Sequence, residues 1–232
     1  MNNSQQNEQE KSVLRWGGLA GIIGGVLFIL AMVVAEGLIP PAPESTTDLI
    51  ARFPDIQLLR FAENTSYLLG LVCGIPLCLA LFWALKNDRL APALFGSALA
   101  IVGLVSMIIS ATPHVAHHRV AKMLNMAEAA AGTHETLGLI FESVWGVFDA
   151  PLYVGFLVGM IGFTLLGAAI LGSTRYRKLL GWLTVVIGGA GVVAAVLQMM
   201  NPASFIGGVS FLAYVVFLFL LGFRTFRLSK AA

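Results

Sequence analysis

The chain has few charged residues and very little cysteine. Of its 232 residues, 11% are charged and 58% are hydrophobic, and the mean hydropathy is +0.86. An ordinary soluble domain has roughly a quarter of its residues charged, so this composition cannot form a water-exposed surface. Cys73 and Cys78 lie five positions apart in an apolar segment, a spacing that suits neither a disulfide nor a thiolate metal pair on a helix. We interpret them as buried structural thiols.

Clustered basic residues are also missing. The formal net charge is only +2, and no segment combines grouped Lys and Arg with interleaved aromatic residues. Nucleic-acid-binding surfaces require that combination, so nucleic acid is not expected as a partner.

Long apolar runs are abundant. Six of them can cross a bilayer, which takes about 20 residues each. The runs cover residues 16–38, 66–85, 91–112, 152–172, 179–200 and 205–223. The sequence therefore predicts one all-α domain over residues 13–228, a polytopic bundle of six transmembrane helices in contact with membrane lipid. A disordered cytoplasmic tail is expected over residues 1–12.

The distribution of basic residues predicts the direction of the spans. Ten of the fourteen Lys and Arg residues fall in the two tails and in the loops after the second and fourth spans. Most acidic residues and all four histidines fall in the remaining loops. Because Lys and Arg are enriched on the cytoplasmic side, we expect both termini in the cytoplasm, in the cell inner membrane.

The outer loops, residues 39–62 and 113–150, are expected to be partly helical. A capping box from Ser45 to Asp48 predicts a short interfacial helix that ends at Pro54. In the second loop, two short helices are expected to meet at a turn around Gly132. The latter of them, residues 134–150, should continue into the fourth span.

Glycines spaced four residues apart mark faces where helices can approach closely. Gly17, Gly21 and Gly25 form one such face, and Gly155 and Gly159 form another. We interpret both as packing faces, since glycine-rich phosphate loops follow a strand in a soluble domain.

Two segments resemble a known family. They are the opening RWGGLAGIIGGVLFILAMVV and the segment VGFLVGMIGFTLLGAAILGSTRYRKLLGWLTVVIGGAGVV from Val154 to Val193. Both are similar to spans of the DUF4386 family of bacterial and archaeal membrane proteins, which has an Ile-Pro-Arg turn where this chain has Arg175 to Lys178. The resemblance implies a six-span fold. It implies no catalytic residues, because the activity of that family is undefined.

The histidines form the candidate metal site. His114, His117 and His118 could share one helix face after the third span, and His134 precedes the fourth. Imidazole and carboxylate together suit zinc or another divalent metal, and an open coordination position would activate water for hydrolysis. The alternative is a solvated polar helix face, because no HExxH or comparably tight motif occurs.

Acidic side chains near the outer ends of the spans are the candidate ligand-binding groups. Glu36 and Glu63 flank the first outer loop, and boundary positions are expected for both; Glu63 is better placed to line a cavity because polar residues follow it. In the second loop, Glu142, Trp145 and Asp149 share a helical rhythm and are the further ligand-binding candidates.

Two functions fit these patterns. We favour a non-catalytic membrane protein whose outward-facing pocket binds a small ligand, lipid or ion in a sensory, accessory or minor transport role. The alternative is a membrane-embedded metal-dependent hydrolase with Glu142 or Asp149 as general base. No catalytic residue is assigned, and the sequence leaves the ligand and the oligomeric state open.

Overall fold

The computed structural model of the chain describes residues 3–41, 46–111, 131–201 and 206–231, and these are almost entirely helical. The elements are α1 (Asn3–Val33), the π-helix η1 (Val34–Leu38), α2 (Thr46–Leu85), α3 (Leu90–Ser110), α5 (Ala131–Leu171), α6 (Lys178–Met200) and α7 (Ile206–Ala231). All six long helices are long and apolar enough to cross a membrane. The predicted all-α, multi-pass membrane protein with six spans is thus confirmed.

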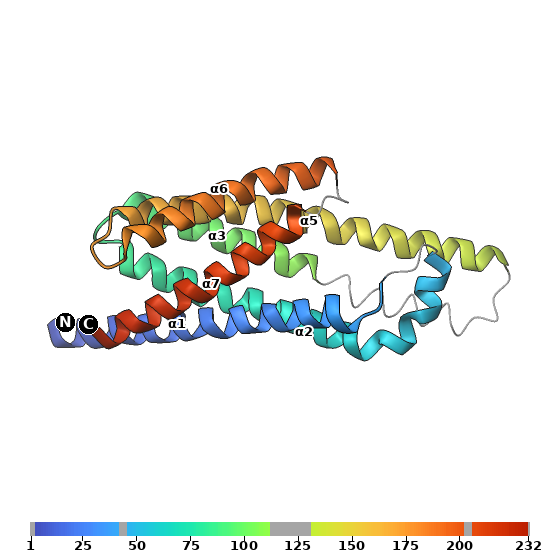
Figure 1. The fold of residues 1–232 in the computed structure, drawn as a ribbon, viewed down its shortest axis with the longest axis horizontal. Coiled ribbons are helices and arrows are strands. Elements are labelled where there is room, and N and C mark those ends of the chain that lie inside the picture. Colours follow the sequence, from blue (N-terminus) through green and yellow to red (C-terminus); the bar gives the residue numbers. More distant parts are fainter. Residues whose placement is uncertain (1–2, 42–45, 112–130, 202–205, 232) are drawn as a thin grey trace.

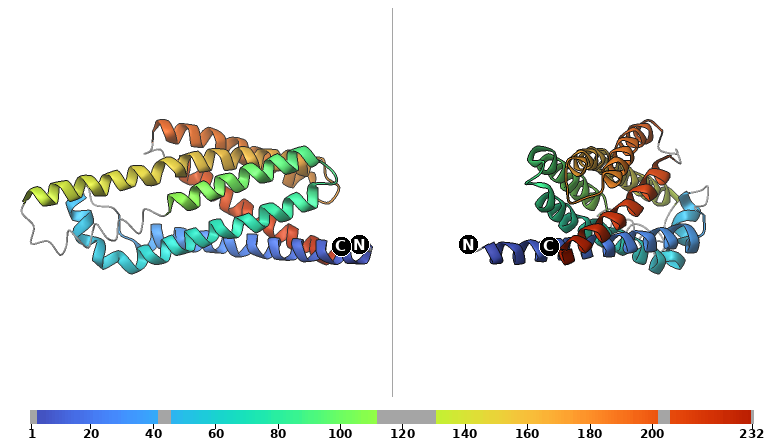
Figure 2. Two further views of the ribbon diagram at one scale, coloured as in Figure 1. Left: turned by 180° about the vertical axis from the view of Figure 1, so that it is seen from behind. Right: turned by 60° about the vertical axis from the view of Figure 1, so that its left-hand side comes forward.

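Both termini lie at the same end of an elongated bundle (Figure 1). The connections from α2 to α3 and from α5 to α6 lie at that end too, as the view from behind also shows (Figure 2). We call it the basic end, because the ten basic residues of the tails and of these two loops belong to it. The opposite end, named the acidic end, carries Glu36, Asp55, Glu63 and Asp149.

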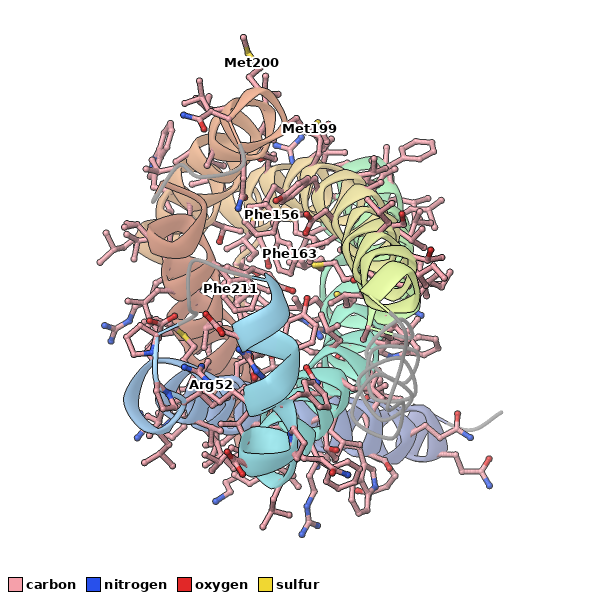
Figure 3. The ribbon with its side chains drawn as sticks, turned by 90° about the vertical axis from the view of Figure 1, so that its right-hand side faces the viewer. Arg52, Phe156, Phe163, Met199, Met200 and Phe211 are labelled. Atoms are coloured by element: carbon pink, nitrogen blue, oxygen red, sulfur yellow. The ribbon has the colours of Figure 1, made fainter. Side chains whose placement is uncertain are left out.

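The helices pack in chain order into a closed ring. Each helix contacts the next along the chain, and α7 contacts α1. Figure 3 looks along this ring from the acidic end. Contacts are most extensive within two groups of three helices: the first group is α1, α2 and α7, and the second group is α3, α5 and α6. The two groups meet chiefly where α2 contacts α3 and where α6 contacts α7.

Glycines bring the helices of the first group close together. A Cβ atom placed on Gly17 would lie 2.3 Å from the Cβ of Ala80 in α2. A Cβ on Gly21 would lie 2.9 Å from the Cα of Gly222 in α7. Both distances are below van der Waals contact, so only glycine allows these approaches. The predicted glycine face of α1 is confirmed, and it serves two neighbouring helices.

The second group is held in the same way. A Cβ placed on Gly103 of α3 would lie 2.5 Å from the backbone N and Cα of Gly159 in α5. A Cβ on Gly155 would lie 2.8 Å from the carbonyl oxygen of Gly103. The predicted face of Gly155 and Gly159 is therefore a helix contact, and the two backbones touch there.

Aromatic side chains fill the centre of the ring toward the acidic end. Their rings meet mostly edge to face, with centroids 5.1 Å apart for Phe163 and Tyr214 and 5.5 Å apart for Phe28 and Phe211. Edge-to-face pairs stabilise the fold by more than the burial of their apolar surface alone provides. The outside of the bundle carries large exposed apolar side chains, among them Trp16, Val186 and Leu179. An apolar exterior around a packed core is what lipid requires.

The loop between α5 and α6 is bound to its neighbours at the basic end. The Ser173 hydroxyl donates to Asp88 at 2.6 Å, and Arg224 donates to the carbonyl oxygen of Arg175 at 3.0 Å. The hydroxyls of Tyr176 and Thr225 form a buried hydrogen bond of 3.1 Å. Burial raises the pKa of Tyr176 to about 12, although the Thr225 hydrogen bond and the nearby arginines lower it in part.

Three expectations for the ends of the helices need correction. α1 begins at Asn3, whereas a disordered tail was predicted over residues 1–12. Two acidic residues of this segment form ion pairs: Glu10 pairs with Arg175, and the exposed Glu8 lies 3.8 Å from Lys11. The helix is thus extended beyond its apolar part.

The outer segments also differ from the expectation. α2 continues through Pro54, where a helix end was predicted, and its first turns lie at a steep angle to the rest (Figure 1). A proline that removes one backbone hydrogen bond explains such a bend. Gly132 lies in the first turn of α5 and not in an interhelical turn. The predicted continuation of residues 134–150 into the fourth span is confirmed.

Candidate functional site

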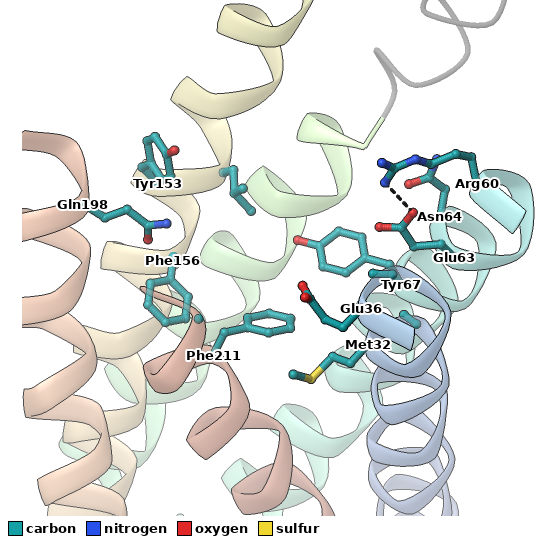
Figure 4. A pocket seen from close by; sticks show the side chains of 14 residues that line it. Met32, Glu36, Arg60, Glu63, Asn64, Tyr67, Tyr153, Phe156, Gln198 and Phe211 are labelled. Atoms are coloured by element: carbon teal, nitrogen blue, oxygen red, sulfur yellow. Dashed lines mark hydrogen bonds and ion pairs between the residues drawn. The ribbon is translucent and has the colours of Figure 1, made fainter. Parts of the chain in front are cut away.

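A cavity of about 390 Å³ lies at the acidic end, between the two groups of helices (Figure 4). The first group and η1 supply ten of its fourteen lining residues, and the second group supplies four. The lining residues are Ala31, Met32, Ala35, Glu36, Arg60, Glu63, Asn64, Tyr67, Leu152, Tyr153, Phe156, Gln198, Gly208 and Phe211. Pockets for small ligands have volumes of about 300 to 1,000 Å³, so this cavity lies at the small end of that range.

Aromatic rings form much of the cavity wall. Tyr67 of α2 and Phe211 of α7 lie with their centroids 6.1 Å apart, and Phe156 of α5 lies 6.4 Å from Phe211. These rings continue the aromatic core of the bundle. The bottom of the cavity is therefore built from packed side chains that are fixed before any ligand binds.

The Tyr67 hydroxyl is an unusual polar group in this wall. Its oxygen is buried and has no hydrogen-bond partner among the described residues. A buried hydroxyl without a partner destabilises a fold by about 1 to 3 kcal/mol. A ligand in the cavity could supply the missing hydrogen bond, because Figure 4 shows the hydroxyl directed into the space that the lining residues surround.

Glu36 is carried by the π-helix η1. The turn is closed by a hydrogen bond of 3.0 Å from the Ile39 amide to the Val34 carbonyl, five residues earlier. Such wide turns are rare and occur frequently at functional sites. The exposed Glu36 side chain reaches the cavity, and among the described residues it has no hydrogen-bond or ion-pair partner.

Contacts with the first turns of α2 hold η1 in place. Val34 and Ile39 form a small buried cluster with Ile56. The Arg52 guanidinium donates to the carbonyl oxygens of Pro40 and Pro41 at 2.7 and 2.8 Å. These contacts hold the segment directly after Glu36, so the backbone position of Glu36 beside the cavity is set by the fold.

Glu63 has a partner, in contrast to Glu36. Its carboxylate accepts a hydrogen bond of 2.8 Å from Arg60, one turn earlier in α2, and both side chains are partly buried. Boundary positions were expected for both glutamates, with Glu63 the better placed to line a cavity. The structure places both side chains in the cavity wall. Ligand binding by Glu63 stays a prediction.

The other predicted site residues are not brought together in the described part of the structure. Asp149 is half-buried in α5, one turn before Tyr153, and does not line the cavity. Glu142, Trp145 and His134 lie in α5, but their side chains fall outside what the structure describes. His114, His117 and His118 lie outside the described residues. Within those that are described, no three His, Cys, Asp or Glu side chains are grouped to hold a metal ion, and the metal site stays a prediction.

Comparisons of the chain with protein-family models, with curated proteins and with solved structures found no match. The function must therefore be argued from the cavity and its residues.

Proposed function

We propose that the protein binds a small amphiphilic ligand in the cavity at the acidic end, without catalysing a reaction on it. The observation that carries this proposal is the buried Tyr67 hydroxyl, which lacks a partner and points into a cavity with aromatic walls. Apolar walls with a few convergent polar groups are typical of ligand sites. Besides the two tyrosine hydroxyls, the polar groups here are Glu36, Asn64, Gln198 and the paired Arg60 and Glu63.

The position of the cavity between the two groups of helices supports the same proposal. Each group is held internally by glycine contacts, whereas fewer contacts join one group to the other. A ligand that touches both groups would bridge them. Binding would therefore stabilise the bundle, which makes thermal stability a suitable measurement.

We further propose that both termini lie in the cytoplasm, so that the cavity faces the outside of the cell inner membrane. The support is the gathering of ten of the fourteen Lys and Arg residues at the basic end. The short helical segments of the outer loops would then be extracytoplasmic. A six-span fold of the DUF4386 kind fits this arrangement.

A thermal-shift screen of the purified protein tests the proposal. Small aromatic amines, alcohols and carboxylates are added to the parent protein and to Gly208→Phe. Gly208 lines the cavity and a Cβ there would meet no atom within 4 Å, so the new ring can occupy the cavity without a clash. Gly189→Phe in α6 is the matched control, because a Cβ at Gly189 also meets no atom within 4 Å and Gly189 does not line the cavity.

We expect at least one compound to stabilise the parent and Gly189→Phe but not Gly208→Phe. A ligand at about a hundred times its Kd stabilises a protein by about 2.7 kcal/mol, which a melting curve resolves. The proposal is wrong if no compound of the three classes stabilises the parent more than it stabilises Gly208→Phe.

A further inference from the structure

The charges of the cavity wall select among possible ligands. Among the described lining residues, three side chains carry a formal charge at neutral pH: Glu36 and Glu63 are negative, and Arg60 is positive. The formal charges of these three side chains sum to one negative charge. Because Arg60 is paired with Glu63 at 2.8 Å, that excess charge belongs to Glu36.

Resting on the proposed function, we infer that the ligand joins a positively charged amine to an apolar body, and that Glu36 is the carboxylate that pairs with the amine. Figure 4 shows the Glu36 carboxylate and the Tyr67 hydroxyl directed into the same space, with Phe156 and Phe211 on its other side. An ammonium group has three N–H donors. It can donate to the Glu36 carboxylate and to the Tyr67 hydroxyl oxygen at once.

The aromatic walls favour the same ligand. The face of an aromatic ring carries negative potential and attracts cations, more strongly where the cation is desolvated. Phe156, Phe211 and Tyr67 offer such faces, and they also provide apolar contacts for the body of the ligand. An anionic group would gain neither the attraction to the ring faces nor the ion pair with Glu36.

Other ligand classes fit the wall less well. A carboxylate or phosphate ligand would need a free cation, and Arg60, the one cationic side chain among the lining residues that the structure describes, is engaged by Glu63. A bare divalent ion requires several oxygen or nitrogen ligands, and the described residues contain no group of three that could hold a metal. An uncharged ligand would leave the Glu36 carboxylate without a partner.

Two sources could supply an amine with this chemistry. One is a water-soluble aromatic or aliphatic amine from outside the cell. The other is the ammonium headgroup of phosphatidylethanolamine, whose acyl chains would lie along the apolar exterior of the bundle. Both present the same group to Glu36, so the experiment includes an arm that separates them.

Calorimetry of the full chain in lipid nanodiscs tests the inference, with 2-phenylethylamine as the cationic probe and 2-phenylethanol as its neutral analogue. The affinity ratio of amine to alcohol is measured for the parent, for Glu36→Gln and for Asp55→Asn. Asp55 is the matched control because it is an exposed acid at the same end that does not line the cavity. The Glu36 side chain is exposed, and an exposed ion pair contributes at most about 1 kcal/mol, so we expect Glu36→Gln to lower the ratio by up to about fivefold. Asp55→Asn should leave it unchanged.

The alcohol serves as an internal control in each variant, since a misfolded protein would bind neither probe. Nanodiscs of phosphatidylglycerol alone are compared with nanodiscs that also contain phosphatidylethanolamine. Weaker amine binding with phosphatidylethanolamine identifies the headgroup as the competing source, and equal binding identifies a free amine.

The inference is overturned if the parent binds the alcohol as tightly as the amine, or if Asp55→Asn lowers the ratio as much as Glu36→Gln. Binding that is blocked by Gly208→Phe but shows no preference for the amine would leave the proposed function standing.

Discussion

Gly103 offers the sharpest test of the packing that supports the cavity. In Gly103→Ala the added Cβ would lie 2.5 Å from the carbonyl oxygen of Gly155 and 2.5 Å from the backbone N and Cα of Gly159. Carbon atoms in contact are normally about 3.5 to 4.0 Å apart, so the helices must separate by about 1 Å. All three neighbouring atoms are backbone, so no side-chain rotation can relieve the clash.

The cost can be compared with that of a control glycine. Overpacking of a tight contact destabilises a protein by about 1 to 3 kcal/mol. Gly189→Ala adds the same methyl group to α6 with no atom within 4 Å of it, and replacing glycine inside a helix stabilises it by roughly 0.5 to 1 kcal/mol. Gly103→Ala has the same helix gain, so the two variants should differ in free energy of unfolding by the overpacking cost alone, about 1 to 3 kcal/mol.

Thermal unfolding in detergent, followed by circular dichroism, measures the difference. For a chain of this size each kcal/mol shifts the Tm by about 2 to 4 °C, so Gly103→Ala should melt at least about 2 °C below Gly189→Ala. Equal melting temperatures would mean that α3 and α5 do not approach through Gly103.

Three further perturbations test other parts of the structure. A reporter that is active only outside the cytoplasm, fused after Ala232, should give no signal; strong activity would contradict the proposed orientation. Arg52→Gln removes the guanidinium that holds Pro40 and Pro41, so it should lower the stability by about 1 to 3 kcal/mol in urea unfolding, and an unchanged midpoint would refute this role. Burial raises the pKa of the Tyr176 hydroxyl from its ordinary value of 10.0 to about 12 in the folded protein. The protonated hydroxyl therefore contributes fully to stability below pH 10, and this contribution is lost as the pH rises from 10 to 12. Tyr176→Phe should lose less stability between pH 10 and 12 than the parent does, and equal losses would argue against a buried hydroxyl.

The sequence predicts those parts of the fold that depend on local composition. Six apolar runs become six helices because each backbone must satisfy its own hydrogen bonds in lipid. The spacing of Gly17, Gly21 and Gly25 identifies a packing face, although it does not reveal that α2 and α7 share it. The helix ends are predicted less well. The ion pair of Glu10 with Arg175 joins residues far apart in the chain, and no local pattern indicates it.

The cavity was largely beyond sequence reasoning, because its shape depends on how two groups of helices diverge. Glu63 could be chosen from the polar residues that follow it. From the sequence, Glu36 looks like an ordinary residue at a span boundary. The π-helix that carries it has the sequence VAEGL, and nothing in these five residues indicates a π-helix. Phe156 and Phe211 look like any apolar residues of a span. The sequence does hold one indication of the cavity, which is the tyrosine near the outer end of a span, Tyr67. A buried tyrosine hydroxyl usually needs a hydrogen-bond partner.

The most direct test of ligand binding at the acidic end is the modification rate of Gly208→Cys in intact cells, with Cys73 and Cys78 replaced by alanine. A membrane-impermeant maleimide is added from outside, with and without 2-phenylethylamine. We expect modification in intact cells, because Gly208 lines a cavity proposed to face outward, and we expect the amine to slow it severalfold by occupying the same space. Modification only after the cells are opened would contradict the orientation, and a rate that the amine leaves unchanged would contradict amine binding in the cavity.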